Sequence, residues 1–131
     1  MSYADSIDDV RREIPLLEEI HKKYRDLIYN KKVHFSELVF TKRISKDTDE
    51  YLDKKRNTIE SCVIHQLYNN GKSLFAGQEI KYFIVDFYNN NNLKRASPIE
   101  LIEHDSSPNY DTTRYCELLY DCYHSIIKYF L

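Results

Sequence analysis

Residues 71–100 read GKSLFAGQEIKYFIVDFYNNNNLKRASPIE and form the stretch that decides the fold. β-Branched and aromatic side chains dominate residues 80–87, which predicts a strand. Gly71 and Gly77 precede this strand and are the only glycines in the 131-residue chain. Glycine relieves strain where the backbone must take a positive φ. We therefore expect both glycines at turns that lead into the strand.

The segments around this strand predict one further helix and one further strand. Thr58 is a suitable N-cap for a helix over residues 59–69, and Gly71 lies just beyond its end as a stop signal. Residues 37–44 alternate loosely between apolar and polar and predict a short strand. The four consecutive asparagines that follow residue 88 predict an exposed loop.

Two longer helices are predicted toward the ends of the chain. Apolar residues recur at helical spacing over residues 15–30 and again over residues 113–130. Pro15 suits the first turn of a helix, where its missing N–H costs little. We therefore predict an α+β fold in a single domain, residues 1–131, in which two long helices and a shorter one pack on a small antiparallel sheet (about 37–44 and 80–87).

Composition limits the classes of protein that the chain can represent. The net charge is −2 and the pI is about 6.2, so contact with nucleic acid would have to come from a local basic patch. The chain has three cysteines, an odd number that favours a reducing, intracellular setting. No apolar run approaches about 20 residues, so we expect no membrane contact.

Candidate metal sites are weakly supported. The triplet Asp47-Thr48-Asp49 offers carboxylate oxygens of the kind that magnesium prefers. However, Glu50 and a charged run follow it, and no apolar strands surround it, so a solvated acidic loop is the favoured interpretation. Cysteine and histidine lie close together in the two helices over residues 59–69 and 113–130, but their spacing does not favour zinc, and we interpret the cysteines as small buried apolar residues.

The sequence predicts no catalysis and no cofactor. The sequence shows no pattern typical of a catalytic serine or cysteine with histidine and aspartate. Two glycines are too few to build a glycine-rich phosphate-binding loop. The remaining signal is a set of basic groups near loops, each beside a serine, threonine or asparagine that could contact phosphate. Their alternative interpretation is a solvated charged surface. The groups are Lys42-Arg43 with Lys46, Lys54-Lys55-Arg56, Lys72 and Lys94-Arg95.

A series of short motifs runs in order along nearly the whole chain, from about Asp9 to Leu131. The motifs are Val10-Arg11-Arg12-Glu13, Glu37-Leu38-Val39-Phe40, Ile44-Ser45-Lys46 with Tyr51, Leu74 to Tyr82 with Gly77 and Ile80, Arg95-Ala96-Ser97-Pro98-Ile99-Glu100, and Tyr110-Asp111 with Tyr115. Together they resemble the thumb subdomain of family B DNA polymerases, especially archaeal ones. The chain departs from that pattern at Ile59-Glu60, where the family has Pro-His, and at Ala76, where it has proline.

The resemblance implies a thumb, either free-standing or excised, that binds nucleic acid through the phosphate backbone, without regard to sequence and without catalysis. The implied partners are duplex or primer–template DNA and a separate polymerase subunit, as in DNA replication. Ser45 and Lys46 match the family segment that faces the primer side. Arg95 belongs to a family box and either contacts nucleic acid or braces its loop. The candidate binding residues are Arg43, Ser45, Lys46, Lys55, Arg56 and Arg95.

A second interpretation remains open. The chain could be a thumb-derived protein-interaction module of a virus or mobile element in which DNA binding has been lost. The acidic net charge favours this second interpretation, whereas the retained lysine and arginine groups favour the first. No exonuclease, palm or fingers motif is present in the 131 residues, so we expect the chain to be at most a fragment or subunit of a polymerase.

Overall fold

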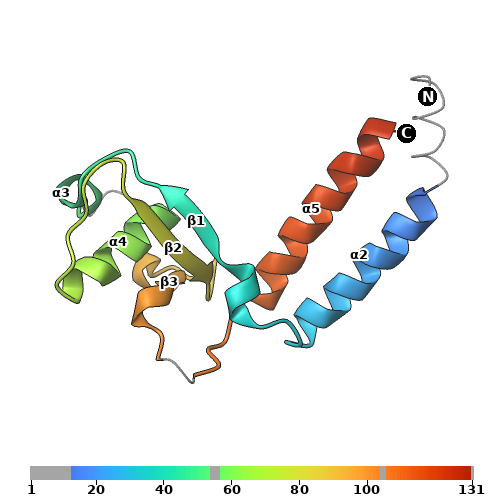
Figure 1. The fold of residues 1–131 in the computed structure, drawn as a ribbon, viewed down its shortest axis with the longest axis horizontal. Coiled ribbons are helices and arrows are strands. Elements are labelled where there is room, and N and C mark those ends of the chain that lie inside the picture. The colour runs from blue at the N-terminus through green and yellow to red at the C-terminus, as the bar shows by residue number, and fades with distance from the viewer. Residues whose placement is uncertain (1–12, 54–56, 104–105, 131) are drawn as a thin grey trace. The chain divides into compact units, whose positions relative to one another are not determined.

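The computed structural model describes residues 13–53, 57–103 and 106–130, and its contacts divide the chain into two compact units. Among the described residues, one unit combines residues 13–32 with residues 112–130. The other is the continuous segment from Val33 to Asp111 (Figure 1). The α+β class predicted from the sequence is confirmed. No described helix combines the length and the apolar character that crossing a membrane requires.

The first unit is a pair of helices that pack on each other, α2 (Ile14–Tyr29) and α5 (Thr112–Phe130). Both match the predicted ranges to within one residue. The seam between them contains the ring of His21, which stacks on Tyr123 with 4.6 Å between the ring centroids. Only Ile28 of α2 is fully buried. The apolar faces of α2 and α5 therefore cover each other only in part.

The second unit is built on a three-stranded antiparallel sheet in the order β1-β2-β3. Its strands are β1 (Phe40–Arg43), β2 (Glu79–Ile84) and β3 (Ala96–Pro98). Tyr82 is central in the register, because it pairs with Phe40 on one side and with Pro98 on the other. Helix α4 (Ile59–Asn69) packs against β3, as Figure 1 shows.

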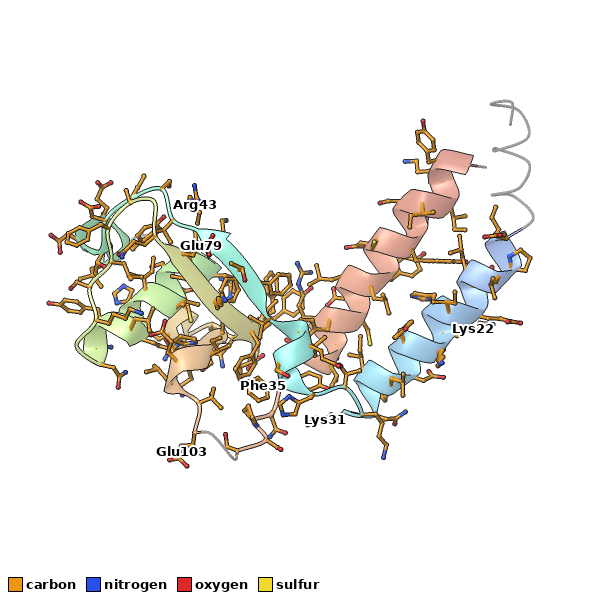
Figure 2. The ribbon with its side chains drawn as sticks, in the orientation of Figure 1. Lys22, Lys31, Phe35, Arg43, Glu79 and Glu103 are labelled. Atoms are coloured by element: carbon orange, nitrogen blue, oxygen red, sulfur yellow. The ribbon has the colours of Figure 1, made fainter. Side chains whose placement is uncertain are left out.

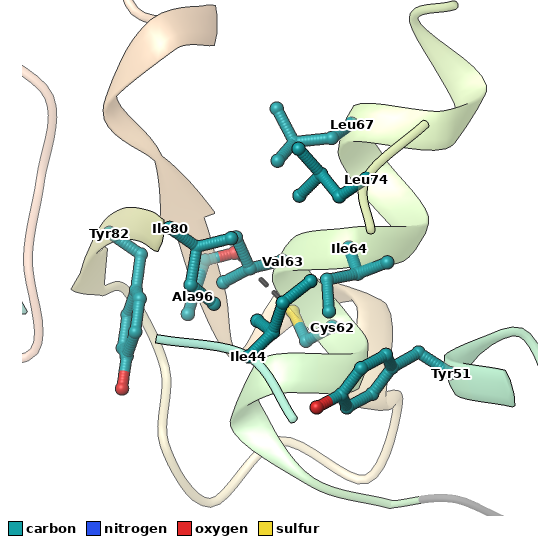
Figure 3. Close-up of a cluster of buried hydrophobic side chains, with 10 residues drawn as sticks. All are labelled: Ile44, Tyr51, Cys62, Val63, Ile64, Leu67, Leu74, Ile80, Tyr82 and Ala96. Atoms are coloured by element: carbon teal, nitrogen blue, oxygen red, sulfur yellow. Dashed lines mark hydrogen bonds between the residues drawn. The ribbon is translucent and has the colours of Figure 1, made fainter. Parts of the chain in front are cut away.

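The core of the second unit is a cluster of buried side chains from α4, the sheet and the loops around them (Figure 3). Its members are Ile44, Tyr51, Cys62, Val63, Ile64, Leu67, Leu74, Ile80, Tyr82 and Ala96. Helix α4 contributes Cys62, Val63, Ile64 and Leu67 to this cluster. Cys62 is buried and free, and its Sγ donates to the carbonyl oxygen of Ala96 at 3.4 Å. All three cysteines are unpaired, but Cys122 is exposed, so the interpretation of the cysteines as buried apolar residues is wrong for Cys122.

The predicted cap of α4 and the two predicted turn glycines are confirmed. The hydroxyl oxygen of Thr58 accepts a hydrogen bond from the backbone N–H of Ser61 at 3.1 Å, so Thr58 caps α4. Gly71 follows the end of α4 with φ +88°. Gly77 precedes β2 with φ +93°, and its N–H donates to the carbonyl oxygen of Ile44 at 2.8 Å. Both glycines thus occupy the left-handed conformations that other residues adopt only with strain.

Both predicted strands are shorter in the structure. Residues 35–38 form a 3-10 helix, because the ring of His34 accepts from the N–H of Ser36 and caps the turn. Strand β2 ends at Ile84, since the N–H groups of Val85 and Asp86 both donate to the carbonyl oxygen of Arg95. The prediction also omitted β3 and a short helix, α3 (Thr48–Tyr51).

The two ends of the second unit are tied together. The hydroxyl of Tyr110 donates to the carbonyl oxygen of Val33 at 2.7 Å. The N–H of Asp111 donates to the carbonyl oxygen of Ile84 at 3.0 Å, and the Asp111 carboxylate accepts from the N–H of Phe87 at 2.8 Å. The segment from Val33 to Asp111 therefore begins and ends at one place on its own sheet.

Candidate nucleic-acid interface

The end of β1 brings three of the predicted binding residues together. Arg43, Ser45 and Lys46 follow one another along the chain, and Ile44 between them is buried at 2% exposure. The N–H of Ile44 donates to the carbonyl oxygen of Gln78, which completes an anchor on the neighbouring chain segment. A buried side chain with both backbone groups bonded fixes the residues beside it, so this short basic stretch has a defined position.

Arg43 and Ser45 each make one polar contact within the unit. The side chain of Arg43 is 72% exposed and lies 4.0 Å from the carboxylate of Glu79 on β2 (Figure 2). An ion pair this exposed contributes little to stability, so the guanidinium stays available to another anion. The backbone N–H of Ser45 donates to the hydroxyl of Tyr51 at 3.3 Å, and Ser45 as a residue is exposed.

A surface hollow of about 320 Å³ opens beside this stretch, next to the start of α4. The residues that line it are Lys42, Arg43, Ser45, Lys46, Tyr51, Thr58 and Glu60. Three of these seven are cations, one is a carboxylate, and three carry hydroxyl groups. Cations and hydroxyls in one concave place are the groups that proteins use to hold phosphate oxygens.

The carboxylate in the hollow is paired with one of its cations. The Nζ atom of Lys42 donates to Oε1 of Glu60. This hydrogen bond, together with the charge of Glu60, raises the pKa of Lys42 although burial opposes it. Burial alone would raise the pKa of Glu60, but the bond from Lys42, the backbone N–H and the charge of Lys42 together lower it. Both groups are therefore charged at neutral pH.

Two residues of the Asp47-Thr48-Asp49 triplet bind α3 to the segment that precedes β2. Oδ1 of Asp47 accepts from the N–H of Ala76 at 2.7 Å. The hydroxyl of Thr48 accepts from the N–H of Leu74 at 2.7 Å and lies 3.2 Å from the Leu74 carbonyl oxygen, to which it donates. Thr48 is 3% exposed and opens α3, so the prediction of a solvated loop is wrong here. Among the described residues, no group of three or more histidine, cysteine, aspartate or glutamate side chains is placed to hold a metal ion.

Arg95 braces the loop that precedes β3. Its Nε donates to the carbonyl oxygen of Phe87 at 2.7 Å, and its Nη1 donates to the carbonyl oxygen of Asn57 at 3.2 Å and to Oδ1 of Asn92 at 3.1 Å. Its guanidinium carbon also lies 4.7 Å from the centre of the Phe87 ring. Arg95 does not line the hollow beside Lys46. Of the two roles that the sequence left open, these contacts support the bracing one.

The bracing role predicts a loss of stability when only the shape of the Arg95 head group changes. We expect Arg95→Lys to lower the free energy of unfolding by about 1 kcal/mol, because an ammonium cannot reach three acceptors in the plane of the guanidinium. Chemical denaturation followed by circular dichroism measures this. The matched control is Arg43→Lys, which keeps the charge at an exposed site and should change stability by under about 0.5 kcal/mol. Equal losses in both variants would contradict the bracing role.

The other basic groups lie elsewhere or cannot be placed. Lys55 and Arg56 fall outside the described residues, directly before Asn57. Lys72 forms an ion pair with Glu100 at 2.7 Å and is not part of the hollow. The sequence therefore predicted Arg43, Ser45 and Lys46 as neighbours but did not associate Glu60 with them. The only local sign for Glu60 was its place in the first turn after the Thr58 cap.

Comparison with known proteins gives an informative likeness among solved structures. No model of a protein family matches the chain, and no curated protein matches it. Among solved structures, the chain is similar to the family B DNA polymerase from the hyperthermophilic archaeon Pyrobaculum calidifontis, with a TM-score of 0.63 and 20% sequence identity. The alignment covers 96% of this chain and 15% of the polymerase chain. The chain thus shares the fold of one part of an archaeal family B DNA polymerase.

Proposed function

We propose that this chain is a thumb-like module that binds the phosphate backbone of duplex or primer–template DNA without reading its sequence. The observation that carries the proposal is the hollow beside β1, which gathers Lys42, Arg43, Ser45 and Lys46 in one place. The likeness to part of a family B DNA polymerase supports the same proposal through the fold. The module performs no catalysis itself, and a separate polymerase subunit would supply the chemistry.

The arrangement suits backbone binding because its groups are charged or simple donors. Phosphate oxygens accept hydrogen bonds from lysine, arginine and serine side chains, and such contacts carry no base information. Arg43 and Lys46 reach the hollow from the same short stretch, on a backbone held by the buried Ile44. A few fixed cations on an otherwise slightly acidic chain give contact that is local and sensitive to salt.

Binding is tested with duplex and primer–template DNA of unrelated sequences, followed by fluorescence anisotropy across a salt series. Three to four basic residues in contact with phosphate, of which the hollow supplies Arg43 and Lys46, predict a slope of about −3 for log K against log salt concentration. Similar affinity for all sequences is expected. Absence of binding at about 50 mM salt, where phosphate contacts are strong, would refute the proposal.

Within this experiment, Lys46→Glu is expected to weaken binding by about tenfold for every sequence alike, because it replaces an attraction to phosphate by a repulsion. The matched control is Lys23→Glu on α2, an exposed lysine of the other unit that receives the same change of charge. It should weaken binding far less. A loss confined to some sequences, or equal losses in both variants, would contradict backbone binding at this hollow.

One observation favours a second candidate function. Between α2 and α5, an apolar hollow of about 140 Å³ has Ile20, Tyr24 and Ile126 on its lining, each more than 40% exposed. Exposed apolar side chains gathered in one place often mark a surface for another protein. We infer that a thumb-derived protein-interaction module, of a virus or mobile element, is the alternative. It would be favoured if the DNA experiment showed no binding.

A further inference from the structure

The ion pair between Lys42 and Glu60 lies inside the hollow that the proposed function assigns to phosphate. Lys42 comes from the middle of β1, and Glu60 comes from the first turn of α4. Both side chains line the hollow together with Arg43 and Lys46. A carboxylate inside a site for phosphate is a charge of the wrong sign, and it calls for a physical account.

The two partners differ in how firmly they are held. The side chain of Glu60 is only 18% exposed, whereas that of Lys42 is 54% exposed. The position of Glu60 in the first turn of α4 also favours its negative charge, because the N-terminal end of a helix carries a partial positive charge. Glu60 is therefore the fixed partner, and the long, flexible Lys42 side chain is the one that can move.

We propose that Glu60 competes with nucleic-acid phosphate for Lys42 and so limits the affinity of the hollow. This inference rests on the proposed function, because it concerns the same hollow. While Lys42 stays on Glu60, the pair adds no net charge, and Arg43 and Lys46 alone attract a phosphate. A bound phosphate that draws Lys42 toward itself must leave the carboxylate without its partner. Glu60 thus acts as a positioning residue that sets how many cations the hollow offers.

Removing the charge of Glu60 while keeping its shape should release Lys42 to the phosphate. We expect Glu60→Gln to tighten duplex binding about fivefold near 0.1 M salt, the effect of one unit charge at contact distance in water. The slope of log K against log salt should become steeper by about 0.9, which corresponds to one additional cation on the backbone. The affinities of the two proteins should therefore converge as salt rises.

The matched control is Glu100→Gln. Glu100 is also paired with a lysine, Lys72, and both side chains of that pair are about half exposed, at 46% and 48%. Neither residue lines the hollow. This variant makes the same change in net charge, so it corrects for general attraction to DNA. It should leave the salt slope unchanged and change the affinity much less than Glu60→Gln does.

A second measurement uses the unaltered protein and does not depend on how the variants fold. NMR of the side-chain carboxyl carbon of Glu60 is followed as a short duplex is added. We expect its chemical shift to stay in place at saturation, because Lys42 remains on Glu60 in the complex of the unaltered protein. A Glu60 signal that moves with saturation, by more than the carboxyl carbon of Glu100 does, would show that phosphate takes Lys42 from the carboxylate, and it would overturn the inference.

The outcomes separate this inference from the proposed function. If the unaltered chain binds DNA and Glu60→Gln binds no more tightly, or gains no more than Glu100→Gln, the inference fails and the function stands. If only Glu60→Gln binds, the inference holds and the proposed function of the natural chain fails. If neither protein binds at about 50 mM salt, both proposals are refuted.

Discussion

Phe83→Ala should lower the free energy of unfolding by about 4 kcal/mol, the largest effect that we expect from any single truncation in this chain. Phe83 is 0% exposed. It lies on β2, and its ring packs against Phe35 with 5.1 Å between the ring centroids. The Phe83 ring lies where the sheet meets the 3-10 helix, and its removal leaves a cavity there. Because a small unit is closely packed, the surrounding side chains can fill little of that cavity.

The measurement is chemical denaturation followed by circular dichroism, and the chain offers a matched control. Phe75 is 68% exposed and carries the same side chain. Phe75→Ala should therefore change the free energy of unfolding by under about 0.5 kcal/mol. Equal losses in the two variants, or a loss below about 2 kcal/mol at Phe83, would show that Phe83 is not part of a packed core.

Thr48→Val is expected to cost about 2 kcal/mol, although valine matches threonine in shape. The Thr48 hydroxyl accepts from the N–H of Leu74 and donates to the Leu74 carbonyl oxygen. Leu74 is itself 4% exposed. After the change, its N–H has lost the acceptor that the hydroxyl provided, and water has little access to it. An unsatisfied buried donor is more costly than the loss of an exposed hydrogen bond.

Thr41→Val is the control for this prediction. Thr41 is exposed on β1, where a β-branched apolar residue suits the strand, so its replacement should change stability by under about 0.5 kcal/mol. Thermal unfolding of both variants measures the difference. If Thr48→Val were as stable as the unaltered chain, the hydrogen bonds between the Thr48 hydroxyl and Leu74 would not form in solution.

Features that depend on neighbouring residues were predictable from the sequence. Helices α2, α4 and α5 follow from apolar spacing, from the Thr58 cap and from Pro15 in the first turn. The positive φ of Gly71 and Gly77 follows from the scarcity of glycine and the need to turn before β2. Each of these signals is contained within a few residues, so no knowledge of the rest of the fold is required.

Features that depend on distant partners were not predictable. Strand β3 has three residues and ends in Pro98, too short for an alternation and poor in strand-forming signals. Helix α3 has four residues and is held by bonds to the distant Leu74 and Ala76. In α2, the helical spacing correctly gave a helix, but Leu16 remains 52% exposed, because periodicity identifies an apolar face without showing how much of it a partner will cover.

In the candidate site, too, the residues that are adjacent in the sequence were predictable and the contacts between distant segments were not. Arg43, Ser45 and Lys46 could be predicted together because they are contiguous. The contacts of Arg95 with Phe87, Asn57 and Asn92 join it to three places in the chain, and the contact with Asn57 spans 38 residues, so the sequence alone could not predict this set. Glu60 enters the site only because the register of β1 and the position of α4 place its carboxylate on Lys42. A residue whose proposed effect is to weaken binding belongs to no binding motif, so the sequence alone could not identify it.

The bond from Tyr110 to the carbonyl oxygen of Val33 has a consequence for the order of events during biosynthesis. Everything that the 33–111 unit requires leaves the ribosome as one uninterrupted piece, and its closing contact is made as soon as Tyr110 emerges. Helix α2 is translated before this unit and its partner α5 is translated after it. The 33–111 unit can therefore fold first, while α2 remains without its partner until α5 has been translated.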